Sequence, residues 1–260
     1  MKSIIKALAV SLALTLPAVA LAAVVPGAGV IGTDHDFTTN ATNTTTIGLC
    51  TFCHTPHSAI TTALLWNHKL SGNTFAWDDA KTTGGTNYPS ILGATYKGPT
   101  VKCLSCHDGS VAIGDVAVYK GAPGEYSGNK KVGDDIPLTP AMAAKVIGAA
   151  GNMKGNHPVG MPYPFGSASN TYNGITTGAN VVLAEFDPAP TSSGALATIN
   201  LFTQTATAPT RGATAGITGM ECSTCHDPHN KAATDDFFLR AKIAGKSKAD
   251  GYICTQCHIK

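Results

Sequence analysis

Four short cysteine-histidine motifs carry the chemistry that this sequence can support. Two cysteines three residues apart, followed directly by a histidine, are typical of a c-type haem attachment site. The thiols would bond to the haem vinyl groups, and the histidine would lie beneath the iron as its proximal ligand. The expected tethers are all eight cysteines of the chain, and one histidine follows each pair: Cys50, Cys53 and His54; Cys103, Cys106 and His107; Cys222, Cys225 and His226; Cys254, Cys257 and His258.

Zinc sites, disulfides and redox pairs are the other uses of CxxC. Two such pairs can build a Cys₄ zinc site without any histidine. A thioredoxin-type redox pair needs alternating strands and helices around it, and the sequence shows no such pattern. With 9 histidines in 260 residues, chance would place one after all four pairs about once in a million. The sequence therefore predicts four covalently bound haem c groups with their iron.

The remaining histidines decide what such irons can do. They are His35, His57, His68, His157 and His229. An iron closed by two imidazoles can only pass electrons, whereas an open sixth position allows chemistry. Five candidates for four positions favour closure at every iron, and at least one of the five is an ordinary histidine. His157 lies between turn residues, which suits a fixed ligand. His68 fits a solvent-facing histidine as well as a ligand.

Two of these histidines share one placement, three residues after a proximal histidine. They are His57 in His54-Thr55-Pro56-His57 and His229 in His226-Asp227-Pro228-His229. The proline restricts the backbone just before each second histidine. Each second histidine starts on the proximal side of its own haem and cannot easily reach the opposite face. We expect it to ligate a different iron, in the same chain or in another subunit.

The chain begins with a segment typical of a secretory signal, residues 1–22. Lys2 and Lys6 precede an apolar run that ends in Ala20-Leu21-Ala22, a small-residue cleavage pattern. A membrane anchor needs about 20 apolar residues and would not end this way. We expect an exported protein without a membrane span. The rest, 23–260, is expected to be one tetrahaem domain, with motifs in 23–160 and 219–260 and a loop-and-hairpin insertion over 161–218.

Charge is sparse in this sequence. Only 13% of residues are charged, against about 25% in an average soluble domain. Loss of the two signal lysines takes the formal charge from +2 to 2 − 2 = 0. No basic stretch indicates a nucleic-acid partner. A weakly charged surface resists association poorly and suits a protein that packs against copies of itself.

Bound haem, rather than sequence periodicity, is expected to organise the fold. We predict a multihaem cytochrome c fold that is mostly irregular, with short α-helices near the CxxCH sites, a few short β-hairpins and a haem-filled core. Helices are expected over 59–70 and 235–244. Long loops normally argue against such an assignment, but a tethered cofactor gives them a surface to pack on.

The motif order resembles that of the doubled CXXCH multihaem cytochromes, because CxxCHxPH followed by a second CxxCH occurs once in each half. With four motifs in this length, the chain is similar to the OmcE-type tetrahaem cytochromes, which form extracellular filaments. The resemblance implies bis-histidine irons in an unbroken stack, electron transfer rather than enzymatic catalysis, and a homopolymer. It favours His35, His157 and His229 as distal ligands, His57 as the ligand that crosses to the next subunit, and His68 as the spare.

Two other functions remain open at this stage. One is a soluble periplasmic electron carrier, although small tetrahaem carriers are far shorter and rich in lysine. The other is a multihaem reductase, which needs one five-coordinate haem with acid-base groups above it. If the filament expectation holds, the partners are upstream periplasmic or outer-membrane cytochromes and extracellular electron acceptors, and the protein lies outside the cell or on its surface.

Overall fold

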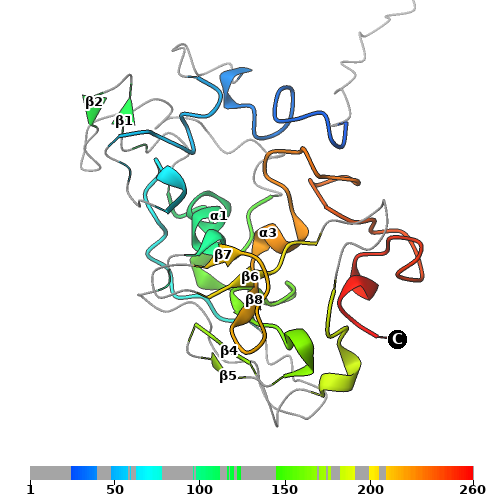
Figure 1. The fold of residues 1–260 in the computed structure, drawn as a ribbon. Coiled ribbons are helices and arrows are strands. Elements are labelled where there is room, and N and C mark those ends of the chain that lie inside the picture. Colours follow the sequence, from blue (N-terminus) through cyan, green and yellow to red (C-terminus); the bar gives the residue numbers. More distant parts are fainter. Residues whose placement is uncertain are drawn as a thin grey trace, which may run out of the picture.

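The computed structural model describes more than half of the chain (Figure 1). The described residues are 25–39, 48–57, 59, 63–77, 96, 98–111, 116, 118–119, 122–123, 145–168, 170–173, 175–176, 182–190, 199–204 and 209–259. The predicted secretory signal, residues 1–22, lies outside them. Within these ranges, no helix has the length and apolar character needed to cross a membrane.

Regular structure in the described residues comes in short pieces. The α-helices are α1 (Pro99–His107) and α3 (Cys222–Cys225). The 3-10 helices are η1 (Phe37–Thr39), η2 (Ala63–Leu65), η3 (Ala149–Gly151), η4 (Phe165–Ser167), η5 (Leu183–Glu185) and η6 (Cys254–Gln256). The strands are β1 (Val118–Tyr119), β2 (Ala122–Pro123), β3 (Met161–Pro162), β4 (Thr171–Tyr172), β5 (Ile175–Thr176), β6 (Phe202–Thr203), β7 (Thr210–Arg211) and β8 (Thr218–Met220).

The longest helix, α1, carries the whole second cysteine-histidine motif. It begins with Pro99, whose missing N–H costs nothing there because the first amides of a helix have no partner within it. It ends at His107, where the amide of Asp108 donates to the carbonyl oxygen of Leu104 at 3.0 Å. Leu104 is fully buried, so packing of one helix face fixes the direction of the motif.

A small antiparallel sheet leads directly into α3. Its strand order is β3-β8-β6-β7, with Met161 opposite Met220 and Phe202 opposite Gly219. Gly219 is required at this point, since a Cβ there would meet the Tyr172 ring and the Met161 carbonyl. Figure 1 shows β6 and β8 beside α3. The buried strand β8 therefore anchors the start of the third motif.

Apolar residues form three small clusters in the described part of the chain, not one continuous core. The largest contains Phe75, Trp77, Tyr96, Leu104, Met153 and Met161. The second contains Tyr163, Leu201 and Met220, and the third Ile199 and Ala241. Apolar packing among the described residues is therefore divided between separate small groups.

The two helix predictions beside the motifs, over 59–70 and 235–244, are wrong. Of the described part of 59–70, only Ala63–Leu65 is helical, as one 3-10 turn, and 235–244 forms turns and isolated bridges. Leu64 and Leu65 have φ of 63° and 50°, and Phe237 and Phe238 have φ of 58° and 59°. Left-handed pairs of this kind cannot continue a right-handed helix.

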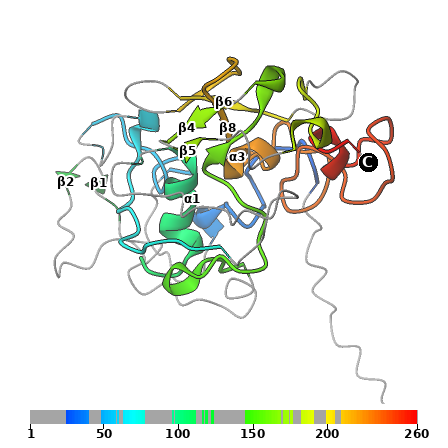
Figure 2. The same cartoon turned by 90° about the horizontal axis from the view of Figure 1, so that it is seen from below.

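The two α-helices lie next to each other near the middle of the molecule, as Figures 1 and 2 both show. The C-terminal segment with η6 lies at the periphery, on the side opposite the β1–β2 hairpin. The second and third motifs are therefore central, and the fourth is near an edge.

Candidate functional site

All four cysteine-histidine motifs adopt the same local geometry, a single helical turn. The amides of His54, His226 and His258 donate to the carbonyl oxygen of the first cysteine of their motif, at 2.8, 3.0 and 2.9 Å. The second motif lies inside α1. One turn places both cysteines on the same side and puts the histidine directly after them. The sequence predicts short α-helices near the motifs, and the structure has the helices α1 and α3 at the second and third motifs.

The cysteines do not form disulfides. All eight lie in the described residues, and all are free thiols. No three histidine, cysteine or acidic side chains of the described residues come close enough to hold a bare metal ion. Burial raises the pKa of Cys53 and Cys106 to about 12. Redox-active CxxC pairs need a stabilised thiolate, and burial disfavours the thiolate of these two cysteines.

Three pairs of histidine rings, which we call the facing pairs, lie at similar separations, two of them edge-on with an interplanar angle of 66° and one tilted by 30°. The ring centres are 6.0 Å apart for His35 and His107, 6.1 Å for His54 and His229, and 6.3 Å for His157 and His258. Two metal–nitrogen bonds of about 2 Å, plus about 1 Å from each nitrogen to its ring centre, give roughly 6 Å. Each gap is therefore the width that one six-coordinate iron between two imidazoles requires.

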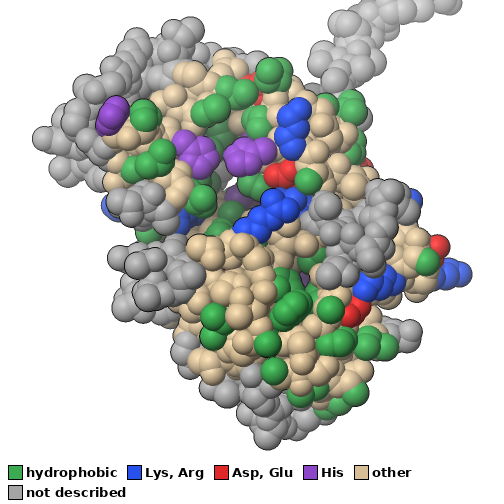
Figure 3. Space-filling view, in the orientation of Figure 1, with side chains coloured by type: hydrophobic (Ala, Val, Ile, Leu, Met, Phe, Trp, Pro, Cys, Tyr) green, Lys and Arg blue, Asp and Glu red, His purple; other side chains and the backbone are tan. Residues whose placement is uncertain are grey.

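Each pair joins one histidine of a cysteine-histidine motif to one of the five additional histidines. The donor set beside each gap is thus two thiols and two imidazoles, which is the set that a covalent haem with two axial histidines uses. The residues present fit that group. Figure 3 shows histidine side chains gathered around a hollow in the molecular surface.

Backbone carbonyls fix the orientation of the rings. Nδ1 of His54, His107 and His226 lies 2.5, 3.1 and 2.8 Å from the carbonyl oxygens of Leu64, Lys145 and Phe237, respectively. When Nδ1 carries the proton and donates it to a carbonyl, Nε2 keeps a free electron pair. This is the tautomer that metal ligation through Nε2 requires. Leu64 and Phe237 have positive φ, and their carbonyls approach Nδ1 of His54 and His226. The same contact that orients these rings therefore prevents the predicted helices.

The second ligands are held in the same way. Nδ1 of His35 lies 3.1 Å from the carbonyl oxygen of Pro228, and Nδ1 of His157 lies 2.9 Å from that of Pro158. Burial lowers the pKa of His35, which favours the neutral, ligating form.

Three histidines stand outside the facing pairs. His226 and His57 face no other histidine ring among the described residues, which include all nine histidines. His57 is exposed. His68 is buried at 1% exposure, and its Nδ1 lies 3.0 Å from the carbonyl oxygen of Lys69.

The four motifs follow one another in space as they do in sequence. Burial, and next the neighbouring Cys106 thiol, raise the pKa of Cys53. A hydrogen bond with Cys222 is the main cause that raises the pKa of Cys103. Burial, and next the Cys257 thiol, raise the pKa of Cys225 to about 12. The first motif therefore borders the second, the second borders the third, and the third borders the fourth.

A buried carboxylate lies where the second and third motifs meet, and sequence reasoning missed it. Glu221 is fully buried, and the hydroxyls of Tyr96, Tyr172 and Thr100 donate to it. Burial raises the pKa of Glu221, although these hydrogen bonds oppose the rise. Glu221 directly precedes Cys222, but nothing in its sequence context distinguishes it from an exposed glutamate.

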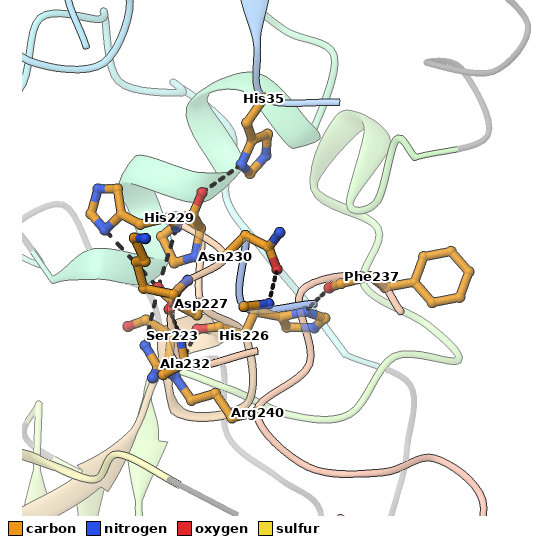
Figure 4. Close-up of polar contacts among 12 residues, drawn as sticks. His35, Ser223, His226, Asp227, His229, Asn230, Ala232, Phe237 and Arg240 are labelled. Carbon is orange, nitrogen blue, oxygen red and sulfur yellow. Dashed lines mark hydrogen bonds and ion pairs between the residues drawn. The ribbon is translucent and has the colours of Figure 1, made fainter. Parts of the chain in front are cut away.

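Asp227 and Arg240 form the other buried polar cluster of the site (Figure 4). Nη2 of Arg240 lies 3.5 Å from Oδ1 of Asp227, and both side chains are less than a tenth exposed. Nε of Arg240 donates to the carbonyl oxygens of Ser223 and His226, both at 3.1 Å. This pair braces the third motif and the turn that follows it.

No family model matches the chain, and no curated protein matches it.

Proposed function

We propose that this chain is an electron-transfer protein that holds four covalent haem c groups between pairs of histidines. The observation that carries the proposal is the set of three facing histidine pairs, with ring centres 6.0–6.3 Å apart, beside three of the four cysteine-histidine motifs. Haem iron supplies the ferric–ferrous exchange when bound. The eight cysteines would tether the haems, and each of the three histidine pairs would hold one iron and exclude other ligands from it.

The order of the four motifs in space supports transfer along a series of sites. Cys53 borders Cys106, Cys103 borders Cys222, and Cys225 borders Cys257. Groups tethered at adjacent thiols lie close together, and the fourth motif lies at the periphery, where a partner can approach it (Figure 2). The carbonyls that accept from Nδ1 increase the electron density on each ligating ring, which is a means of tuning the iron potential.

We further propose that copies of this chain associate through His57. Within the described residues, His226 is the one proximal histidine without a facing ring, and the exposed His57 is also unmatched. A copy that offers His57 to the iron above His226 of another copy would close the fourth site. Repetition of this contact builds a homopolymer, as the resemblance to OmcE-type cytochromes implies. Export, upstream cytochromes and extracellular acceptors belong to this proposal.

A multihaem reductase is the second candidate. It is favoured by the lack of a facing histidine ring at His226 within the described residues. An iron at His226 that no second histidine reaches would be open to substrate. The measurement that separates the two functions is carbon monoxide binding by the reduced, haem-loaded protein, together with its electron paramagnetic resonance (EPR) spectrum.

The proposed function predicts low-spin signals alone and no carbon monoxide binding in assembled protein. Dissociated chains should bind about one carbon monoxide each, because only the His226 site opens. Binding to two or more haems in the assembled protein would contradict the bis-histidine proposal. Cryo-electron microscopy that shows only monomers at high concentration would contradict association through His57.

A further inference from the structure

Two segments of the chain share one backbone structure beyond the motif itself. We call residues 50–67 the first cradle and residues 222–240 the second cradle. In the first, Nδ1 of His54 approaches the Leu64 carbonyl oxygen at 2.5 Å, and Asn67 N donates to the Cys53 carbonyl at 2.9 Å. Isolated β-bridges join His54 to Trp66 and His226 to Leu239.

The second cradle repeats these contacts with one additional residue. Nδ1 of His226 approaches the Phe237 carbonyl oxygen at 2.8 Å, and Arg240 N donates to the Cys225 carbonyl at 2.8 Å. Both cradles contain the left-handed pair of residues described above. The position of Arg240 therefore corresponds to that of Asn67, and Asp227 corresponds to Thr55.

The cradles differ in charge at these two corresponding positions. The Asn67 amide and the Arg240 guanidinium both donate to a carbonyl inside their CxxC, that of Thr51 at 2.5 Å and that of Ser223 at 3.1 Å. Arg240 also reaches Asp227. Threonine and asparagine carry no charge, so the first cradle cannot form this ion pair.

Asp227 organises the backbone that carries His229. Its Oδ1 accepts from the amide of His229 at 3.2 Å, and its Oδ2 accepts from the amides of Lys231 and Ala232 at 2.8 and 2.6 Å. Asp227 is 5% exposed. In the first cradle the Thr55 hydroxyl instead donates to the His57 carbonyl oxygen at 2.9 Å, and one hydroxyl oxygen cannot accept from three amides.

The turn that Asp227 holds also places His35. The Pro228 carbonyl oxygen lies 3.1 Å from Nδ1 of His35. The buried Asn230 side chain accepts from the amide of Gly27 and donates to the carbonyl of Gly29, so the arm that carries His35 docks on the same turn. Figure 4 shows His35 and His229 on either side of it.

We propose that the Asp227–Arg240 pair is a positioning element that keeps His229 and His35 as second ligands within their own chain. The neutral counterpart, Thr55 with Asn67, leaves His57 unattached to an iron of its own chain. The proposal deepens the proposed haem function and depends on it. Asp227 thus keeps His229 as a ligand within its own chain. Thr55, at the corresponding position of the first cradle, leaves His57 available to a neighbouring copy.

The test compares D227N and R240Q with wild type as haem-loaded full-length protein. The matched control is T55V, at the corresponding position of the first cradle. Carbon monoxide bound per chain by the reduced protein, the EPR spectrum and the haem content are measured for each. D227N and R240Q are expected to bind up to two more carbon monoxide molecules per chain than wild type, because the sites of His54 and His107 lose their fixed second ligands. T55V is expected to match wild type.

Several outcomes would overturn the proposal. One is a D227N or R240Q protein with four haems, wild-type EPR signals and wild-type carbon monoxide binding. Equal gains in T55V would also overturn it. If D227N loses haem, R240K and R240Q are compared instead. R240K keeps the positive charge and should bind as much carbon monoxide as wild type. Equal additional carbon monoxide binding by R240K and R240Q would reject a role for the ion pair. Wild-type protein that already binds carbon monoxide at two sites would instead reject the proposed function.

Discussion

A single imidazole decides whether an iron can bind an outside molecule. His157 and His258 face each other at 6.3 Å, and His157 is exposed, so its removal should disturb little packing. We expect H157A to retain four haems and to bind about one carbon monoxide per chain more than wild type, because one axial position opens. Titration of the reduced protein, followed by absorption spectroscopy, measures this.

The control for H157A is H68Q. His68 is buried, and its Nδ1 lies 3.0 Å from the carbonyl oxygen of Lys69, so the substitution should lower stability. Under the proposed function, in which His157 and not His68 is a second ligand, it should open no iron. Additional carbon monoxide binding in H68Q with no change in H157A would reverse the assignment of ligand and spare.

Asp187, beside the fourth motif, makes the stability of the protein depend on pH. The amide of Asp187 donates to the Cys257 carbonyl at 2.8 Å, and its carboxylate pairs with Lys248. Partial burial raises the pKa of Asp187, but the hydrogen bonds from Lys248 and Ala189 outweigh it and bring the pKa below its ordinary 3.8. A lowered folded-state pKa contributes stability above the unfolded pKa and loses it as the pH falls.

We therefore expect D187N to be less stable than wild type by about 0.5–1 kcal/mol at pH 7, a value kept small because the pair is partly exposed. The difference should disappear as the pH falls below 3.8. Urea unfolding curves of both proteins at neutral and acid pH measure it. A difference that grows in acid would contradict the assigned pKa direction.

At the scale of elements, the left-handed pairs explain both how the cradles work and why helix prediction failed. The apolar character of 59–70 and 235–244 suggested helices facing a haem. In the structure, Leu64 and Phe237 are 56% and 57% exposed, and their carbonyls turn toward the proximal histidines. Leucine and phenylalanine rarely adopt this conformation, so only the tertiary contact reveals it.

Backbone substitution at Leu64 tests this reading. L64V should destabilise the protein by about 1–2 kcal/mol relative to L64G, because a β-branched residue resists a positive φ, whereas glycine adopts it freely. Both variants remove exposed surface, so burial contributes little to the difference. Thermal unfolding of the two variants with equal haem content measures it, and equal stability would show that Leu64 does not hold this conformation in solution.

The four motifs can be recognised from the sequence because their two cysteines and their histidine lie within five consecutive residues. Sequence reasoning did not pair His35 with His107 or His54 with His229, since those rings are separated by 72 and 175 residues (107 − 35 and 229 − 54), and nothing local encodes the match. The buried Glu221 and the Asp227–Arg240 pair were missed for the same reason, because burial of a charged side chain depends on the whole fold.

At the scale of the whole molecule, the proposed function predicts that bound haem contributes much of the stability, because the apolar clusters of the described residues are small. Phe75, Leu104 and Met153 form part of the largest cluster, and the other two contain three and two buried residues. Protein made without haem attachment should show no cooperative unfolding transition and poorly dispersed NMR signals, since binding free energy here is folding free energy. Native-like spectra of haem-free protein would contradict this dependence.

The long separation between His54 and His229 has a consequence for the growing polypeptide. The hydrogen bonds described above for the first cradle lie within residues 50–67, so they can form before the C-terminal region is synthesised. His229, whose ring centre lies 6.1 Å from that of His54, follows 175 residues later. Under the proposed haem function, a chain truncated before His229 would leave the first iron with one open position, which oxygen and small anions could reach.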